Sequence, residues 1–138
     1  ALIVTTTILN EGNNESSEQV LIQSHVPAHL VNPMADVAIT HGGAGTVQTA
    51  IHSGTPIVGI PMHQEQAGNV ALVRKQGAGI MLWKQELTKK HLASALERLI
   101  NNDEYRKNMR RLKSEQDQVN GAANAAQEIV NYLCKNSA

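Results

Sequence analysis

Short apolar runs rich in β-branched residues recur through the first part of the chain. They read ALIVTTTIL, QVLIQ, DVAIT, TPIVGIP and AGIML, and polar or turn-forming residues separate them. Runs of this length and composition predict buried strands. Between the later runs, helical patterns over about 45–53 and 64–76 stop at Gly54 and Gly77, as expected where glycine follows the last turn of a helix. The pattern therefore predicts strands that alternate with helices.

The chain beyond residue 82 shows only helical patterns. Thr88 is suited to cap a helix whose apolar residues recur every three or four positions, and further helices are predicted over about 103–114 and 122–134. Apolar strands that alternate with helices are typical of a parallel sheet covered on both faces. We therefore predict an α/β fold: a Rossmann-like, doubly wound parallel sheet with helices on both faces and a helical C-terminus.

Composition argues against several classes of partner. The 138 residues carry a formal net charge of zero, with one Trp, two Tyr and no Phe. A neutral chain has no electrostatic basis for binding nucleic acid or an anionic membrane, and so few aromatic residues cannot build a base-stacking platform. The length predicts a single domain over 1–138.

The cysteine content and the N-terminal run bear on the origin of the chain. Cys134 is the only cysteine, so an internal disulfide is excluded and a reducing compartment fits. No apolar run is long enough to span a bilayer, and the first run lacks the basic flank of a signal peptide. We expect a cytoplasmic protein. Because the chain opens without Met in the middle of a strand pattern, we also expect a fragment of a longer protein.

The stretch THGGAGT, residues 40–46, is the main candidate for chemistry. In a doubly wound sheet, ligands bind beyond the carboxyl ends of the strands, where the loops HVPAH, HGGAG and PMHQEQ are expected. A glycine-rich turn from a strand into a helix exposes backbone N–H groups and the positive end of the helix dipole. We expect an anion there, bound by the amides of Gly45 and Thr46, the Thr46 hydroxyl and His41. The alternative is a tight corner that needs glycine only for steric reasons.

Other motifs fit less well. The chain has no GxxxxGK[ST], GxGxxG or GxSxG. His25 and His29 are four residues apart, but Pro27 between them disfavours the regular helix that would align them on a metal. His63 and Glu65 match H-x-E, yet the C-x-x-C of zinc deaminases does not follow. We therefore predict no metal site.

The three loops together resemble the nucleotide-sugar signature of family 1, UDP-glycosyltransferase-like enzymes with the GT-B fold. The resemblance is tight over about residues 20–80, and its pieces follow in order as Val26-Pro27, 40–46, Gly54-Thr55-Pro56, Pro61, Glu65-Gln66 and Asn69. It implies the C-terminal, donor-binding half of an inverting glycosyltransferase. The donor would be an NDP-sugar, expected to be a UDP-sugar, with no cofactor and no metal ion.

The resemblance also assigns roles by position. It implies that the donor diphosphate is bound by His41, Gly43, Gly45 and Thr46, the donor sugar by Glu65 and Gln66, and the nucleoside by His25, Val26 and Thr49. A carboxylate and an amide suit the vicinal hydroxyls of a sugar. Asn69 is expected to be a structural support as much as a ligand.

Four positions depart from the family pattern. His25 stands where a Trp stacks on the base, Ala28 where a Gln follows, and Thr49 where a ribose-binding Glu is frequent. Glu65-Gln66 replaces the more frequent Asp-Gln. These differences leave the base and the sugar of the donor open.

The catalytic base and the acceptor site are expected elsewhere. In the GT-B family both belong to an N-terminal domain, to which nothing in this chain corresponds, so no catalytic residue is predicted here. We expect the chain alone to bind a nucleotide sugar weakly and not to turn over. The apolar stripe of the last helix or an unpaired sheet edge could drive self-association. Alternatives are a short donor-binding subunit completed by a separate membrane-bound chain, another GT-B activity such as a GlcNAc transferase or an epimerase, or a structural module.

Overall fold

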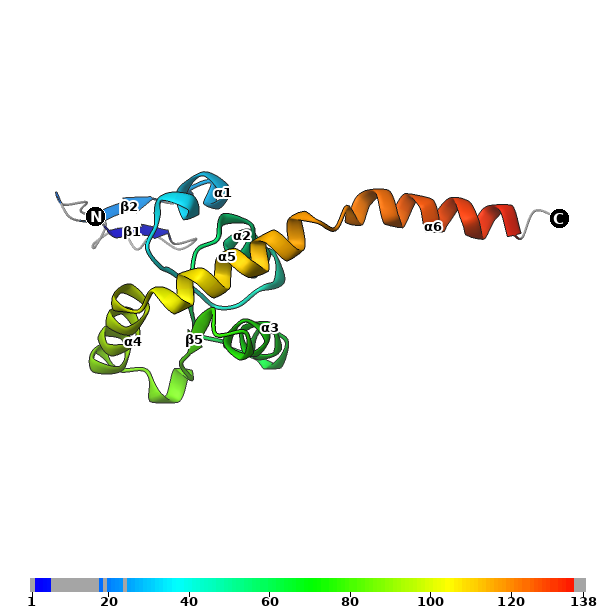
Figure 1. Cartoon of the computed structure of the whole chain (residues 1–138). Helices are drawn as coiled ribbons and strands as arrows, with labels where there is room; N and C mark the ends of the chain where they lie inside the picture. Colours follow the sequence, from blue (N-terminus) through cyan, green and yellow to red (C-terminus); the bar gives the residue numbers. More distant parts are fainter. Residues whose placement is uncertain (1, 6–17, 19, 24, 136–138) are drawn as a thin grey trace.

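Two parallel sheets form the scaffold of the part of the chain that the structure describes. The computed structural model describes residues 2–5, 18, 20–23 and 25–135. In the first sheet, β1 (Leu2–Thr5) pairs with β2 (Val20–Gln23). In the second, the order is β3 (Ala38–Thr40), β4 (Ile57–Gly59), β5 (Gly79–Met81), with every pair parallel. The predicted α/β class with a parallel sheet is confirmed, although within the described residues the strands form two sheets (Figure 1).

Helices follow or connect these strands much as the patterns predict. In chain order they are α1 (Ala28–Val31), the 3₁₀ turn η1 (Asn32–Met34), α2 (Ala44–Ser53), α3 (Gln64–Lys75), η2 (Lys84–Glu86), α4 (Lys89–Asn101), α5 (Asp103–Asp117) and α6 (Gly121–Lys135). Thr88 caps α4 as predicted, because its hydroxyl oxygen accepts a hydrogen bond from His91 N at 3.1 Å. Gly54 ends α2 with a φ of 69°, which glycine adopts without steric cost.

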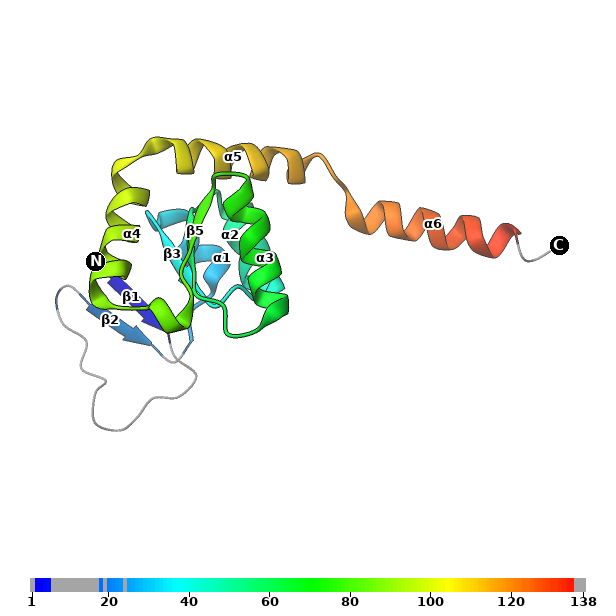
Figure 2. The same ribbon diagram turned by 90° about the horizontal axis from the view of Figure 1, so that it is seen from below.

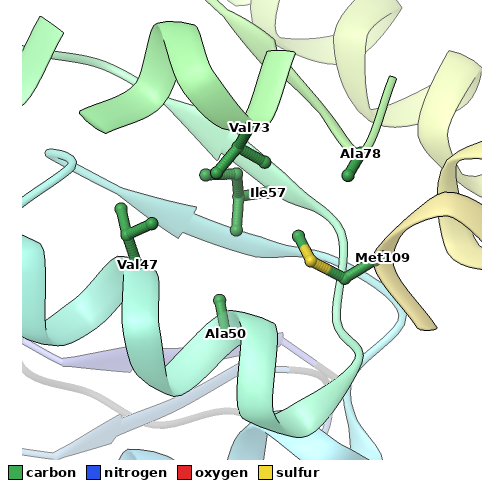
Figure 3. Packing of buried hydrophobic residues seen from close by; sticks show 6 residues of the cluster. All are labelled: Val47, Ala50, Ile57, Val73, Ala78 and Met109. Carbon is green, nitrogen blue, oxygen red and sulfur yellow. The ribbon is translucent and has the colours of Figure 1, made fainter. Parts of the chain in front are cut away.

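The apolar core lies on both faces of the second sheet, as predicted. On one face, Ile57 of β4 packs with Val47 and Ala50 of α2, Val73 of α3 and Met109 of α5 (Figure 3). On the other face, the next residue of β4 packs against α4 in the cluster Val58, Ile60, Ala95 and Leu99. Successive side chains of a strand point to opposite faces, so β4 supplies both clusters. Figure 2 shows α4 on one side of the strands and α2 and α3 on the other.

The strands are shorter than the apolar runs that predict them. TPIVGIP is buried from end to end, but only Ile57–Gly59 forms a strand. Pro56 and Pro61 flank this segment, and proline has no N–H to donate to a ladder. The second half of the first apolar run, residues 6–9, lies outside the described residues.

Helix α6 stands apart from the rest of the fold. It projects away from the body of the molecule, and none of its residues is buried (Figures 1 and 2). Ile129, Val130 and Leu133 are exposed along it. The apolar stripe predicted for this segment is therefore present and is not covered by the described part of the chain.

Candidate functional site

The turn after β3 has a backbone that only glycine can adopt. Gly42 has a φ of 90°, and a Cβ placed there would lie 2.4 Å from Cγ2 of Val70 and 2.9 Å from the carbonyl oxygen of Gln66. Both the dihedral angle and the close approach exclude other side chains. The turn is therefore packed directly against α3, which brings the segment 40–46 next to the helix that carries Glu65 and Gln66.

The N-terminus of α2 is open to an anion. Gly43 is the N-cap, no side chain caps it, and the first turn contains no acidic residue. Ala44, Gly45 and Thr46 are exposed, and nothing within 4 Å would meet a Cβ on Gly45. The first N–H groups of a helix have no partner within the helix, and the dipole makes this end positive. This arrangement fits the anion site expected from the sequence.

His41 lies beside this helix end. A Cβ on Gly43 would come within 2.8 Å of Nε2 of His41, so the imidazole occupies the space that Gly43 leaves empty. His41 is exposed, and no hydrogen bond or ion pair engages its ring within the described residues. Its ring nitrogens are therefore available to a ligand at the N-terminus of α2.

Thr46 has an internal role that the sequence did not reveal. Its hydroxyl donates to the carbonyl oxygen of Gly43 at 2.9 Å and accepts from the hydroxyl of Thr40 at 2.9 Å. Thr40 in turn accepts from the backbone N–H of Gly42 at 3.1 Å. A hydroxyl has one proton to donate, so Thr46 would have to release Gly43 before it could donate to an anion.

Glu65 and Gln66 occupy the first turn of α3, next to the glycine turn. Oε1 of Gln66 accepts from the backbone N–H of Met62 at 2.9 Å, which fixes the entry to the helix. Oε1 of Glu65 accepts from Nδ2 of Asn69 at 2.7 Å, and its Oε2 lies 4.0 Å from Nδ1 of His63. Glu65 is exposed. The amide nitrogen of Gln66 and the second oxygen of Glu65 can therefore meet a hydroxylated ligand.

The residues predicted for the nucleoside lie on neighbouring elements. His25 and Val26 stand between β2 and α1, and α1 packs against α2. Thr49 lies in the second turn of α2, where its hydroxyl donates to the carbonyl oxygen of Gly45 at 2.8 Å. Within the described residues, no hydrogen bond joins His25 or Val26 to the glycine turn. Hydrogen bonds of Asn69 thus join the glycine turn, expected to bind the diphosphate, to Glu65, expected to bind the sugar. The segment with His25 and Val26 is connected to the turn through the packing of α1 on α2.

A hollow adjoins the first turn of α3 at the carboxyl ends of β4 and β5. It has a volume of about 180 Å³, and its walls are Pro61, Met62, His63, Gln64, Ala67, Trp83, Lys84 and Gln85. Trp83 and Met62 are exposed there, although both are large and apolar. Sequence reasoning gave Trp83 no role. Its position directly after the last apolar run, at the carboxyl end of a strand, is the signal that could have drawn attention to it.

Across the described residues, no group of three or more His, Cys, Asp or Glu side chains could hold a metal ion. None of the described helices combines the length and the apolar character needed to cross a bilayer.

Sequence comparison finds a family match over most of the chain. The family described as UDP-glucoronosyl and UDP-glucosyl transferase matches residues 16–123. UDP-glucuronosyltransferase 2A1 of Homo sapiens is 35% identical over 101 residues, which cover 73% of this chain and 19% of that protein. UDP-glucuronosyltransferase 2B14 of Oryctolagus cuniculus is 38% identical over 85 residues, or 62% of this chain and 16% of that protein. The chain thus spans less than a fifth of the length of these relatives.

Structure comparison finds glycosyltransferases of similar fold. The glycotransferase of kitacinnamycin superposes with a TM-score of 0.82 at 26% identity, over 93% of this chain and 34% of that one. The calicheamicin glycosyltransferase CalG4 gives 0.76 at 30% identity, over 86% and 31%. The glycosyltransferase VinC, solved in complex with DTDP, gives 0.77 at 27% identity, over 83% and 29%.

Proposed function

Because this chain belongs to the UDP-glucoronosyl and UDP-glucosyl transferase family and has the fold of GT-B glycosyltransferases, we propose that it is the donor-binding part of an enzyme that transfers a sugar from a UDP-sugar. The observation that carries the proposal is the junction of two loops at one edge of the sheet. There the open N-terminus of α2 lies next to the acidic and amide side chains that begin α3.

In this proposal the diphosphate lies at the N-terminus of α2. The free N–H groups of the first turn and the ring of His41 stabilise its negative charge, Gly43 and Gly45 allow close approach, and Thr46 supports the turn. The charge on the leaving diphosphate grows as the bond to the sugar breaks. Fixed N–H dipoles that already point at this position stabilise that charge without reorganisation. These groups take the part that a metal ion has in other transferases, so no metal is required.

The donor sugar then lies over the first turn of α3. Oε2 of Glu65 accepts a hydrogen bond from one sugar hydroxyl, and the amide nitrogen of Gln66 donates a hydrogen bond to another. The nucleoside extends toward His25, Val26 and Thr49. The transfer is inverting, with the acceptor hydroxyl activated by a general base from the acceptor domain, which is a separate part of the full-length protein. The 138-residue chain accordingly binds the donor but does not turn over.

Binding experiments on the 138-residue chain test the donor site. We expect UDP, UDP-glucose and UDP-glucuronate to shift NMR signals of the turn 41–46, whereas uridine, which lacks the phosphates, binds far more weakly. Replacement His41→Ala should weaken UDP binding about tenfold, the effect of losing one hydrogen bond to a charged group. His52→Ala, which changes an exposed histidine at the far end of α2, is the matched control. The proposal fails if UDP leaves the spectrum unchanged at millimolar concentration.

A further inference from the structure

The side-chain amide of Asn69 joins the two loops of the site. Its Nδ2 donates to the carbonyl oxygen of Gly42 at 3.0 Å and to Oε1 of Glu65 at 2.7 Å. An amide nitrogen carries two hydrogens, so each acceptor can receive one. We propose that Asn69 is a positioning residue that holds the Glu65 carboxylate at a fixed place relative to the glycine turn, so that the diphosphate and the donor sugar are bound in register. This inference rests on the proposed function.

The turn gives Asn69 a rigid point of attachment. Gly42 has little freedom, because a Cβ placed on it would lie 2.4 Å from Cγ2 of Val70 and 2.9 Å from the carbonyl oxygen of Gln66. Its N–H is also bonded to the Thr40 hydroxyl. The carbonyl oxygen of Gly42 is therefore a fixed reference within the diphosphate site. Asn69, in the second turn of α3, donates a hydrogen bond to this oxygen.

Without Asn69, Glu65 would keep among its described contacts only the long one from its Oε2 to Nδ1 of His63, at 4.0 Å. Glu65 is exposed, with 61% of its side chain accessible, and a carboxylate in water samples several rotamers. Residues four apart on a helix lie on the same face, so Asn69 is placed to restrain it. A carboxylate accepts several hydrogen bonds, and the bond from Asn69 occupies only one oxygen. The other oxygen stays available to a sugar hydroxyl.

This role predicts an effect on the sugar that exceeds the effect on UDP. Dissociation constants of UDP and of UDP-glucose are measured by NMR titration of the whole chain and of the variants Asn69→Ala, Glu65→Ala and the double variant. We expect Asn69→Ala to raise the constant for UDP-glucose about tenfold and the constant for UDP less than about threefold. Glu65→Ala should behave in the same way, and the double variant should bind UDP-glucose no more weakly than Glu65→Ala alone.

Two further variants make the result specific. Asn69→Asp keeps the size of the side chain but opposes a second carboxylate to Glu65, so its loss of UDP-glucose binding should at least equal that of Asn69→Ala. Asn108→Ala is the matched control. Asn108 lies on α5, and its side-chain amide likewise donates to a glycine carbonyl oxygen, that of Gly77, at 3.2 Å. It should leave both dissociation constants unchanged. If Asn69→Ala does not fold, Asn69→Ser replaces it in the comparison.

The outcomes separate the role of Asn69 from the proposed function. If the unmodified chain binds UDP but Asn69→Ala weakens UDP and UDP-glucose by the same factor, Asn69 only supports the turn and the inference is wrong. It is also wrong if the losses from the two single variants add in the double variant. If the unmodified chain binds neither UDP nor UDP-glucose, both the proposed function and the role of Asn69 are wrong.

Discussion

At the scale of single residues, the candidate site depends on close contacts that are possible only because glycine has no side chain. Gly42 admits Val70 and the backbone of α3, and Gly43 admits the ring of His41. Gly45 differs, because its surroundings are empty. The three glycines of one short motif therefore have separate reasons to be glycine: a dihedral angle with a close approach, room for a neighbouring ring, and access for a ligand.

Replacement of Gly42 should be the most damaging single change in the turn. Gly42→Ala combines a positive φ with a Cβ that would lie 2.4 Å from Val70, and we expect it to lower the free energy of unfolding by about 3 kcal/mol. Gly45→Ala is the control, since it adds a methyl group to open space in a helix and should leave the stability equal or raise it by about 0.5 kcal/mol. Urea denaturation measures both. Equal stability of the two variants would contradict the packing described for the turn.

Sequence reasoning predicts which residues form the candidate site but not how they are joined. Motif, chemistry and family resemblance predict His41, Glu65 and Gln66. The bond from Asn69 to Gly42 links positions 27 residues apart, and no local pattern predicts it. The sequence predicts a ligand for Thr46 and Thr49, and it does not reveal that both hydroxyls donate to carbonyl groups of their own helix turn. Such bonds depend on side-chain rotamers that a sequence does not specify.

At the scale of elements, helix boundaries were predictable and strand lengths were not. Thr88 and Gly54 have strong local preferences, and the structure confirms the helix ends they mark. Apolar runs report burial, and residues 54–61 are buried throughout, but a ladder also needs backbone donors that proline lacks. The division into two sheets depends on tertiary packing, which leaves no mark on a local pattern.

The cap of α4 gives a prediction at this scale. Thr88→Ala removes the acceptor for His91 N and should lower the free energy of unfolding by about 1 kcal/mol, while Thr88→Ser keeps the bond and should cost less than about 0.5 kcal/mol. Because α4 covers the face of the sheet opposite to α2 and α3, UDP binding should not change in either variant. Chemical denaturation and NMR titration measure the two quantities. A loss of UDP binding in Thr88→Ala would contradict the placement of the donor site.

At the scale of the whole molecule, α6 projects from the body of the fold, and none of its residues is buried. Its exposed Ile129 and Val130 lie on a helix that leaves the body of the fold. The relatives are more than five times as long as the matched segment, so further chain in a full-length protein could cover this helix. A second copy of the 138-residue chain could cover it as well.

We therefore predict that the 138-residue chain self-associates through α6. The sedimentation coefficient should rise with concentration, because burying apolar side chains favours association. The variant Ile129→Gln/Val130→Gln should abolish the rise, whereas Glu128→Gln, on an exposed polar position of the same helix, should not. A concentration dependence that survives the double replacement would place the contact elsewhere, for example at a sheet edge.

The hollow beside α3 gives the molecule an optical property of its own. Trp83 is the only tryptophan of the chain, it is 43% exposed, and it lines the hollow with Met62 and His63. Indole fluorescence shifts to shorter wavelength when water is displaced from the ring, so every change in emission comes from this one place. A ligand that stays at the N-terminus of α2 should leave the emission unaltered, and one that reaches past Glu65 into the hollow should shift it to the blue. Trp83 can thus serve as an intrinsic fluorophore that distinguishes a ligand in the hollow from a ligand at the N-terminus of α2, without any added label.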